Sequence, residues 1–271
     1  MGRRFCITRM GRIRPCRRIV PGLMPCSSST RFSQMSSNVL NRPCFTIFGG
    51  PNGSGKSTAY DRFLRAGLDS GEYLNPDEIA KSLNAGSATG PAVDLRAGRQ
   101  VVLRTRSLID AHRSLVREST LTSREIVRSA ERARSAGYRL VMVFVAVSST
   151  DMTQGRVALR VAKGGHDIPA EAQERRFPRS FSNAPKVARV VDAAYFLDNA
   201  GFEHKLVGTV RSGTITFLDP HQAGCVERAT MGLPRAATLK SRNEALADLR
   251  ETEGLSEELQ VREERSGYVA A

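Results

Sequence analysis

Residues Gly50 to Ser57 read G-P-N-G-S-G-K-S, a spacing of types that can hold the phosphates of a nucleotide. In such a loop, glycines let backbone N–H groups turn toward phosphate oxygens, and the following helix adds the positive end of its dipole. The apolar run Cys44 to Phe48 precedes the loop, and the helix-compatible stretch Thr58 to Leu68 follows it. This strand–loop–helix context favours nucleotide binding over a glycine-rich surface turn.

Within this loop, two side chains carry specific chemistry. Lys56 is expected to reach the β- and γ-phosphates of ATP, and the Ser57 hydroxyl is expected to ligate Mg²⁺. The residues predicted to bind the nucleotide are Gly50, Pro51, Asn52, Gly53, Ser54, Gly55, Lys56, Ser57 and Thr58.

Acidic residues after other predicted strands suggest what is done with the nucleotide. Switch and motor NTPases usually end an apolar strand with a magnesium-holding Asp, but the run Tyr138 to Val147 ends without an acid. Asp77, in N-P-D-E-I-A, and Glu118, in R-E-S-T, follow shorter strands instead. An Asp at the carboxyl edge of the sheet can take a proton from an attacking hydroxyl, which favours a small-molecule kinase. A simple helix N-cap is the alternative for Asp77.

A cluster of arginines follows later in the chain. Arg156 and Arg160 lie four residues apart on one helix face, and Arg175, Arg176 and Arg179 follow a glycine-containing loop. Two Arg-rich helices flanking glycines suit a lid that closes over phosphates, since Arg can hold oxygens with two parallel hydrogen bonds. A solvated basic face is the alternative.

The elements that position these residues alternate between strand and helix, which is typical of a parallel sheet covered by helices. Further strands are predicted at Glu72–Leu74, Ser114–Glu118, Tyr138–Val147 and Ala193–Leu197, with a hairpin of Lys205–Val210 and Thr214–Leu218 across Ser212-Gly213. Further helices are predicted at Pro76–Leu83, Val93–Ala111 and Asp151–Ala162, with another helix capped by Thr122 or Ser123. The predicted fold class is α/β, a P-loop NTPase three-layer sandwich with a mainly parallel sheet, a helical lid and a C-terminal β-hairpin.

The charge is distributed unevenly along the 271 residues. The net charge is +14, but residues 1–34 contain eight Arg and no acid, which leaves 33 Lys and Arg against 27 Asp and Glu elsewhere. We therefore predict a basic, disordered leader at 1–40, a kinase domain at 41–219, and a charged tail at 220–271 that is partly helical, with one helix at Ser241–Leu249, or disordered.

Three interpretations of the leader remain open. It is a spurious extension upstream of a start at Met35, an organellar targeting segment, or a functional basic arm. Three of the five cysteines lie in it, and no C-x-x-C spacing occurs, so neither a disulfide framework nor a zinc site is expected. No apolar stretch approaches the length of a membrane span. We expect a soluble, cytoplasmic protein without a membrane partner, and nucleic acid is not an expected partner.

The order of motifs resembles the zeta-toxin family of P-loop kinases, in its compact stand-alone branch. The matching segments are G-P-N-G-S-G-K-S-T, N-P-D-E-I-A, R-E-S-T-L-T-S, R-V-A-L-R-V-A-K-G-G-H-D-I-P, R-R-F-P-R-S and F-L-D-N, between Cys44 and Gly201. This resemblance implies an ATP-dependent kinase that phosphorylates the 3′-hydroxyl of the amino sugar in UDP-N-acetylglucosamine, and an antitoxin protein as partner.

The resemblance also implies roles for individual residues. The ATP–Mg²⁺ roles fall to Lys56 and Ser57, the general base to Asp77, sugar-nucleotide contacts to Glu118 and Thr120, and phosphate clamping to Arg160 and to Arg176 or its neighbour Arg175. The longer toxins carry an acid in the helix before E-x-T, where this chain offers only Asp94. A nucleic-acid-associated ATPase and a non-catalytic nucleotide-binding regulator are the alternative functions.

Overall fold

The structure, a computed structural model, describes residues 42–68, 71–83, 91–162, 168–201 and 203–256. The predicted leader at 1–40 and the glycines of the loop between the two predicted Arg-rich helices lie outside the described residues. The described residues fall within one compact unit.

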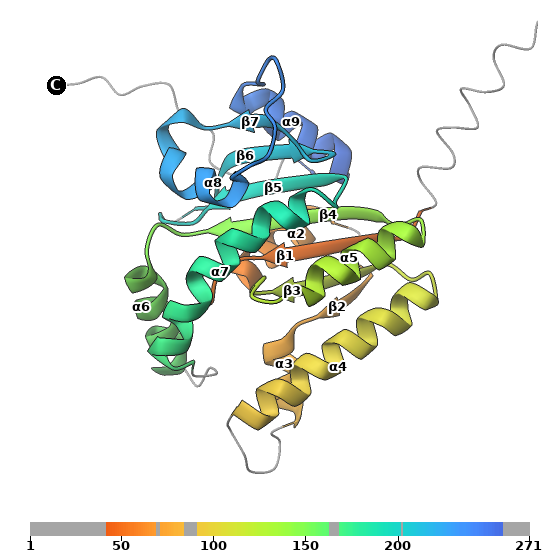
Figure 1. The fold of residues 1–271 in the computed structure, drawn as a ribbon, viewed down its shortest axis with the longest axis vertical. Helices are drawn as coiled ribbons and strands as arrows, with labels where there is room; N and C mark the ends of the chain where they lie inside the picture. Colours follow the sequence, from red (N-terminus) through yellow and green to blue (C-terminus); the bar gives the residue numbers. More distant parts are fainter. Residues whose placement is uncertain (1–41, 69–70, 84–90, 163–167, 202, 257–271) are drawn as a thin grey trace, which may run out of the picture. The chain divides into compact units, whose positions relative to one another are not determined.

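A seven-stranded sheet organises this unit, in the order β2-β3-β1-β4-β5-β6-β7 (Figure 1). The strands are β1 (Cys44–Gly49), β2 (Glu72–Leu74), β3 (Leu115–Ser119), β4 (Arg139–Ala146), β5 (Ala193–Asp198), β6 (Lys205–Arg211) and β7 (Thr214–Leu218). The pairs from β2 through β5 are parallel, and β6 and β7 are antiparallel additions. The predicted strands and hairpin are confirmed.

Apolar side chains explain why the central strands lie where they do. Every residue of β4 after Arg139 is buried, as expected for a parallel strand covered on both faces. The hairpin turn also follows from the sequence, because Ser212 and Gly213 both have positive φ angles, 46° and 77°, which a tight two-residue turn requires.

Helices cover both faces of the sheet, which confirms the three-layer sandwich. They are α2 (Lys56–Arg65), α3 (Pro76–Leu83), α4 (Pro91–Asp110), α5 (Glu125–Ser135), α6 (Thr150–Ala162), α7 (Ala170–Ala188), α8 (Ala223–Thr230) and α9 (Arg242–Glu253), with a 3-10 turn at Pro220–Gln222. Residues of α4, α5, α7 and α8 share one apolar cluster, and residues of α2 and α9 share the other. Figure 1 shows these two groups in front of and behind the sheet.

The segment after residue 219 joins this core. Ser241 caps α9 in a reciprocal capping box with Glu244, and Ala245, Leu246 and Leu249 are buried against the α2 face of the sheet. The predicted helix Ser241–Leu249 is therefore present as α9, which follows the Ser241 cap and ends at Glu253, four residues beyond Leu249. The helix α8 lies where no helix was predicted, and it packs against α7.

Truncating Leu249 tests whether α9 stabilises the domain. The Leu249 side chain is fully buried, so Leu249→Ala should lower the free energy of unfolding by about 2–5 kcal/mol through lost burial and a residual cavity. The matched control is Leu239→Ala, since Leu239 is 38% exposed. Thermal or urea unfolding measures both. Equal stability of the two variants would contradict the packing of α9.

Among the described residues, none of the helices combines the length and apolar character needed to cross a bilayer.

Candidate active site

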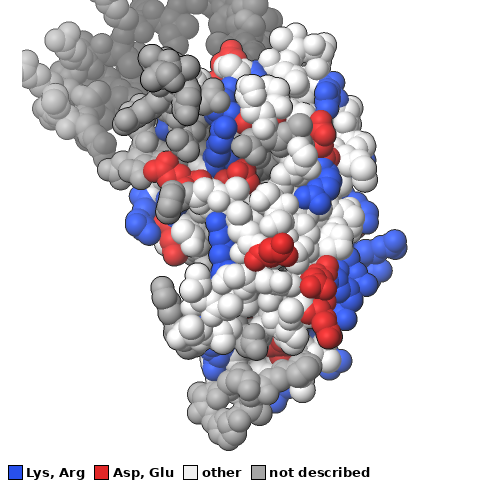
Figure 2. All heavy atoms as spheres, turned by 90° about the vertical axis from the view of Figure 1, so that its left-hand side faces the viewer, with Lys and Arg blue, Asp and Glu red and all other residues white. Residues whose placement is uncertain are grey.

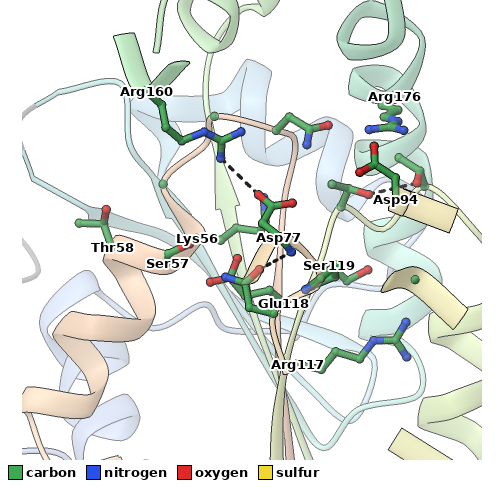
Figure 3. A pocket seen from close by; sticks show the side chains of 18 of the residues that line it. Lys56, Ser57, Thr58, Asp77, Asp94, Arg117, Glu118, Ser119, Arg160 and Arg176 are labelled. Atoms are coloured by element: carbon green, nitrogen blue, oxygen red, sulfur yellow. Dashed lines mark hydrogen bonds and ion pairs between the residues drawn. The ribbon is translucent and has the colours of Figure 1, made fainter. Parts of the chain in front are cut away.

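A cavity of about 640 Å³ opens at the carboxyl ends of β1, β2 and β3 (Figure 3). Such an edge is where open α/β sheets bind ligands. The predicted site residues that line it are Asn52, Gly53, Gly55, Lys56, Ser57, Thr58, Asp77, Glu118, Thr120, Arg160 and Arg176. Three of the predicted nucleotide-binding residues, Gly50, Pro51 and Ser54, do not line it. The structure thus brings the proposed phosphate, base and arginine groups around one space.

The phosphate loop needs glycine where it packs most closely. Gly50 has φ 144°, and a Cβ there would lie 2.3 Å from the carbonyl oxygen of Val145. Gly53 has φ 72°, and a Cβ there would lie 2.6 Å from the carbonyl oxygen of Thr153 in α6. Both positions combine a backbone conformation that side chains rarely adopt with a close approach of another backbone. The loop is therefore held between β4 and α6.

Lys56 begins α2 and turns back over the loop. Its Nζ donates a 2.9 Å hydrogen bond to the carbonyl oxygen of Pro51. Burial lowers the pKa of the Lys56 ammonium, while the nearby carboxylates of Glu118 and Asp77 act in the opposite direction. Figure 3 shows Lys56, Asp77 and Glu118 converging in the middle of the cavity.

Glu118 lies near the end of β3, directly beside Phe48 of the strand that leads into the phosphate loop. Burial raises the pKa of its carboxyl group, and Lys56 and hydrogen bonds from Tyr73 and Ser57 oppose that shift. No acid directly follows the end of β4, where switch and motor NTPases usually carry the one that holds magnesium. The topology places β3 on the other side of β1, and its acid reaches the Ser57 hydroxyl.

Asp77 is not the helix cap. The side-chain Oδ1 of Asn75 accepts a 2.8 Å hydrogen bond from the Asp77 backbone N–H, and the Asn75 carbonyl accepts from the N–H of Ile79. Asn75 therefore caps α3, because it precedes Pro76 and its side chain reaches the second helical N–H. This corrects the capping alternative for Asp77, whose carboxylate points into the cavity instead (Figure 3).

The lid arginines differ in where they lie. Arg160 of α6 contacts Asp77, with 3.3 Å between Nη1 and Oδ2, and both side chains are about two-fifths exposed. Arg156 also lines the cavity and donates a 2.7 Å hydrogen bond to the carbonyl oxygen of Asn199. On α7, Arg176 lines the cavity, whereas Arg175 and Arg179 are exposed and do not. In Figure 3, Arg176 points toward Asp94.

A strained turn positions Thr120. Leu121 has φ 54°, a left-handed conformation that costs a bulky residue about 1–3 kcal/mol. Its N–H bonds the Ser119 hydroxyl at 3.1 Å, and its carbonyl accepts a 2.7 Å hydrogen bond from Asn183 of α7. The Thr120 and Thr122 hydroxyls lie 3.1 Å apart. Strain held this firmly beside a cavity is common at ligand sites.

The predicted cap of α5 is wrong. Arg124 occupies the N-cap position, and no side chain caps the helix. Neither Thr122 nor Ser123 takes this role, because the N-cap position falls on the residue after Ser123; both line the cavity instead.

The floor of the loop involves residues that the sequence analysis did not select. Asn199 follows β5 and donates a 2.7 Å hydrogen bond to the carbonyl oxygen of Ser54. His204 is 2% exposed, and burial lowers its pKa to about 4, so the ring is neutral at physiological pH. The F-L-D-N motif at the end of a strand was a signal for Asn199.

The cavity is also lined on the α4 side by Asp94, which the sequence offered as the acid before E-x-T, and by two residues that were missed, Gly98 and Arg117. Asp94 and Gly98 come from α4, and the buried Arg117 of β3 forms a 2.6 Å ion pair with Glu125. The sequence signal for Arg117 was its position directly before Glu118 in R-E-S-T. No sequence spacing pointed to Gly98.

One face of the molecule carries charges of both signs. On the face shown in Figure 2, basic and acidic side chains of the described residues are interspersed, and no continuous basic surface is visible among them.

The fold and the phosphate loop define an α/β P-loop NTPase. The sequence model of the AAA domain family matches residues 45–182, just over half of the chain. The chain belongs to this family. No curated protein matched the chain.

Several solved structures share the fold. The crystal structure of AvrRxo1-ORF1:-ORF2 with ATP aligns with a TM-score of 0.56 and 16% identity, over 80% of this chain and 73% of that chain. The same pair of proteins with sulphate ions gives 0.56 and 14%, over 87% and 92%. A chain of the PezAT toxin–antitoxin system of Streptococcus pneumoniae gives a TM-score of 0.46 and 11% identity, over 85% of this chain and 97% of that chain. These identities establish similarity of fold alone.

Proposed function

We propose that the protein is an ATP-dependent kinase that phosphorylates a hydroxyl of a small nucleotide-linked sugar such as UDP-N-acetylglucosamine. One observation carries the proposal. The phosphate-loop Lys56, the carboxylate of Asp77 and the guanidinium groups of Arg160 and Arg176 line a single cavity. A phosphate loop without a facing carboxylate suits nucleotide binding alone. A phosphate loop that faces a carboxylate and two guanidinium groups suits transfer of a phosphoryl group to a hydroxyl.

In the proposed reaction, the γ-phosphoryl group passes directly from ATP to the acceptor. Asp77 takes the proton of the acceptor hydroxyl, the hydroxyl oxygen bonds to the γ-phosphorus, and the bond from that phosphorus to the β,γ-bridging oxygen breaks to release ADP. Lys56 and the two arginines stabilise the negative charge on the phosphates. Most of the rate enhancement then comes from positioning and electrostatics.

The chain offers a fitting place for Mg²⁺ at Ser57. The Ser57 hydroxyl lines the cavity with Glu118, and its oxygen can offer lone pairs to a hard cation. Bound there with ATP, Mg²⁺ would supply charge neutralisation at the β- and γ-phosphates. Among the described residues, no group of three or more His, Cys, Asp and Glu side chains forms another metal cluster.

The acceptor is proposed to occupy the side of the cavity formed by Glu118 and Thr120. Carboxylate and hydroxyl groups there match the hydroxyl and amide groups of a sugar nucleotide. The solved AvrRxo1-ORF1:-ORF2 structure of similar fold contains ATP, in keeping with ATP as the donor. An antitoxin partner is proposed from the family resemblance.

Incubation with labelled ATP and a panel of UDP-sugars, followed by mass spectrometry, tests the proposal. We expect an acceptor-dependent phosphorylated product and ADP. A phosphorylated product from another class of acceptor would support the kinase activity and overturn the assignment of a sugar nucleotide as its acceptor. ATP hydrolysis stimulated by DNA or RNA, without any phosphorylated acceptor, would overturn the proposal in favour of a nucleic-acid-associated ATPase.

Lys56→Ala is the reference variant for nucleotide binding. Loss of a charged hydrogen-bonding group is worth about 1.5–3 kcal/mol, so the affinity for ATP should fall roughly 10- to 100-fold. Calorimetry measures this affinity, and Lys81→Ala, on the exposed face of α3, is the matched control. Unchanged ATP affinity in Lys56→Ala would contradict the assignment of the loop.

A further inference from the structure

A chain of hydrogen bonds runs beneath the cavity from α3 to β3. The Asp77 N–H donates to Asn75 Oδ1 at 2.8 Å, Asn75 Nδ2 donates to the Tyr73 hydroxyl at 3.1 Å, and that hydroxyl donates to Glu118 Oε1. Asn75 is 7% exposed and Glu118 5%. The chain connects residues 45 positions apart in the sequence.

The direction of each bond follows from the chemistry of the groups. A backbone N–H can only donate, so the oxygen of the Asn75 amide faces Asp77 and its NH₂ faces Tyr73. The Tyr73 oxygen accepts from that NH₂, and its single proton is therefore available for Glu118. The carboxylate of Glu118 accepts this proton and the proton of Ser57.

Packing holds the middle of this chain in place. The ring of Tyr73 lies parallel to the ring of Tyr60 in α2, with centroids 4.0 Å apart and an interplanar angle of 3°. The Tyr60 ring in turn meets Phe48 of β1 edge to face. Tyr73 is thus stacked on the helix that follows the phosphate loop, and Tyr60 connects it to the strand that leads into that loop. Rotation of its ring would break this stacking.

We propose that Tyr73 and Asn75 are positioning residues that lock Asp77 and Glu118 into one geometry. This inference rests on the proposed function, in which Asp77 takes the acceptor proton and Glu118 contacts the acceptor. Tyr73 does not line the cavity, and the side chain of Asn75, which does line it, is engaged by the Asp77 N–H and the Tyr73 hydroxyl. Their role is to fix the start of α3, which carries the base, relative to the carboxylate beside the phosphate loop.

Two substitutions cut the chain without removing the groups that it positions. Tyr73→Phe keeps the stacked ring and removes the hydroxyl. Asn75→Ser keeps a cap for α3, since Ser caps about as well as Asn, but is too short to reach Tyr73. The matched control is Tyr60→Phe, which removes a hydroxyl from the same stacked pair of rings. The Tyr60 hydroxyl forms no hydrogen bond with another described residue.

The first measurement does not depend on activity. Amide hydrogen exchange at Asp77 should become several-fold faster in Tyr73→Phe, because the Asn75 side chain loses the partner that orients it. Exchange in Tyr60→Phe should match that of the wild type. Unchanged protection of the Asp77 N–H in Tyr73→Phe would refute the positioning role of this chain of hydrogen bonds, whatever reaction the protein catalyses.

The second measurement is acceptor-dependent turnover. Tyr73→Phe and Asn75→Ser should each lower kcat roughly tenfold, since small displacements of reacting groups are costly, with ATP affinity changed less than twofold. The double variant should be no slower than either single variant, because both cut the same chain. Wild-type kcat in both variants, or additive losses, would refute the positioning role. A wild-type protein that phosphorylates no acceptor would instead refute the proposed function, and the exchange result would still test the chain of hydrogen bonds.

Discussion

Asp77→Asn should lower acceptor phosphorylation by roughly 10²- to 10⁴-fold while ATP still binds normally. The amide has the shape of the carboxylate but cannot take a proton from the acceptor hydroxyl. Acceptor-dependent formation of ADP, followed under saturating ATP, measures the effect, and calorimetry measures ATP affinity.

The structure removes the main structural explanation for such a loss. Asn75, not Asp77, caps α3, so the substitution leaves the cap in place. It does weaken the contact with Arg160, but both side chains are about two-fifths exposed, and exposed pairs contribute at most about 1 kcal/mol. The melting temperature should therefore change little.

Glu78→Gln is the matched control for this experiment. Glu78 is the next residue of the same helix, is exposed, and does not line the cavity. It should keep wild-type turnover. Near-wild-type turnover in a folded Asp77→Asn protein would remove Asp77 from the chemistry.

Arg160→Ala should lower kcat by a factor on the order of 10³ while weakening ATP binding far less. In the proposed reaction, the guanidinium group stabilises charge that is greatest on the transferring phosphoryl group. Arg160→Lys should restore little activity, because an ammonium group lacks the planar pair of donors.

Arg175→Ala serves as the control, since Arg175 is an exposed lid arginine that does not line the cavity. Single-turnover kinetics separate the chemical step from binding and release. If Arg160→Ala and Arg175→Ala turned over equally fast, Arg160 would belong to a solvated face.

Local patterns in the sequence were sufficient to predict most strands and the phosphate loop. The run that became β4 is apolar at almost every position, and the Ser212-Gly213 pair requires a tight turn. By contrast, α8 was missed and α9 was expected within a charged tail, because their few buried residues are scattered among charged ones. Such short apolar stripes stabilise a helix only when they pack on a face of the sheet, and the local sequence does not show that this face is available.

The candidate site was predictable where one motif carried the information. The pairing of Glu118 with Ser57 depends on β3 lying beside β1, which no local spacing encodes. The contact between Tyr73 and Glu118 spans 45 positions, and the cap at Asn75 competes with an equally plausible cap at Asp77. The order of the strands and the geometry of the α3 cap decide these contacts, and only the three-dimensional structure shows them.

The C-terminal helix α9 and the residues after it brace the helix that follows the phosphate loop. No described residue after Asn199 lines the cavity, yet Leu255 packs in the same apolar cluster as α2, and the N–H of Ser256 donates a 2.7 Å hydrogen bond to the carbonyl oxygen of Ala66, just past the end of α2. A polypeptide shortened before α9 would keep every cavity residue but lose the brace on the helix that starts at Lys56. A domain boundary placed directly after the last motif would exclude the residues that pack against the helix following the phosphate loop.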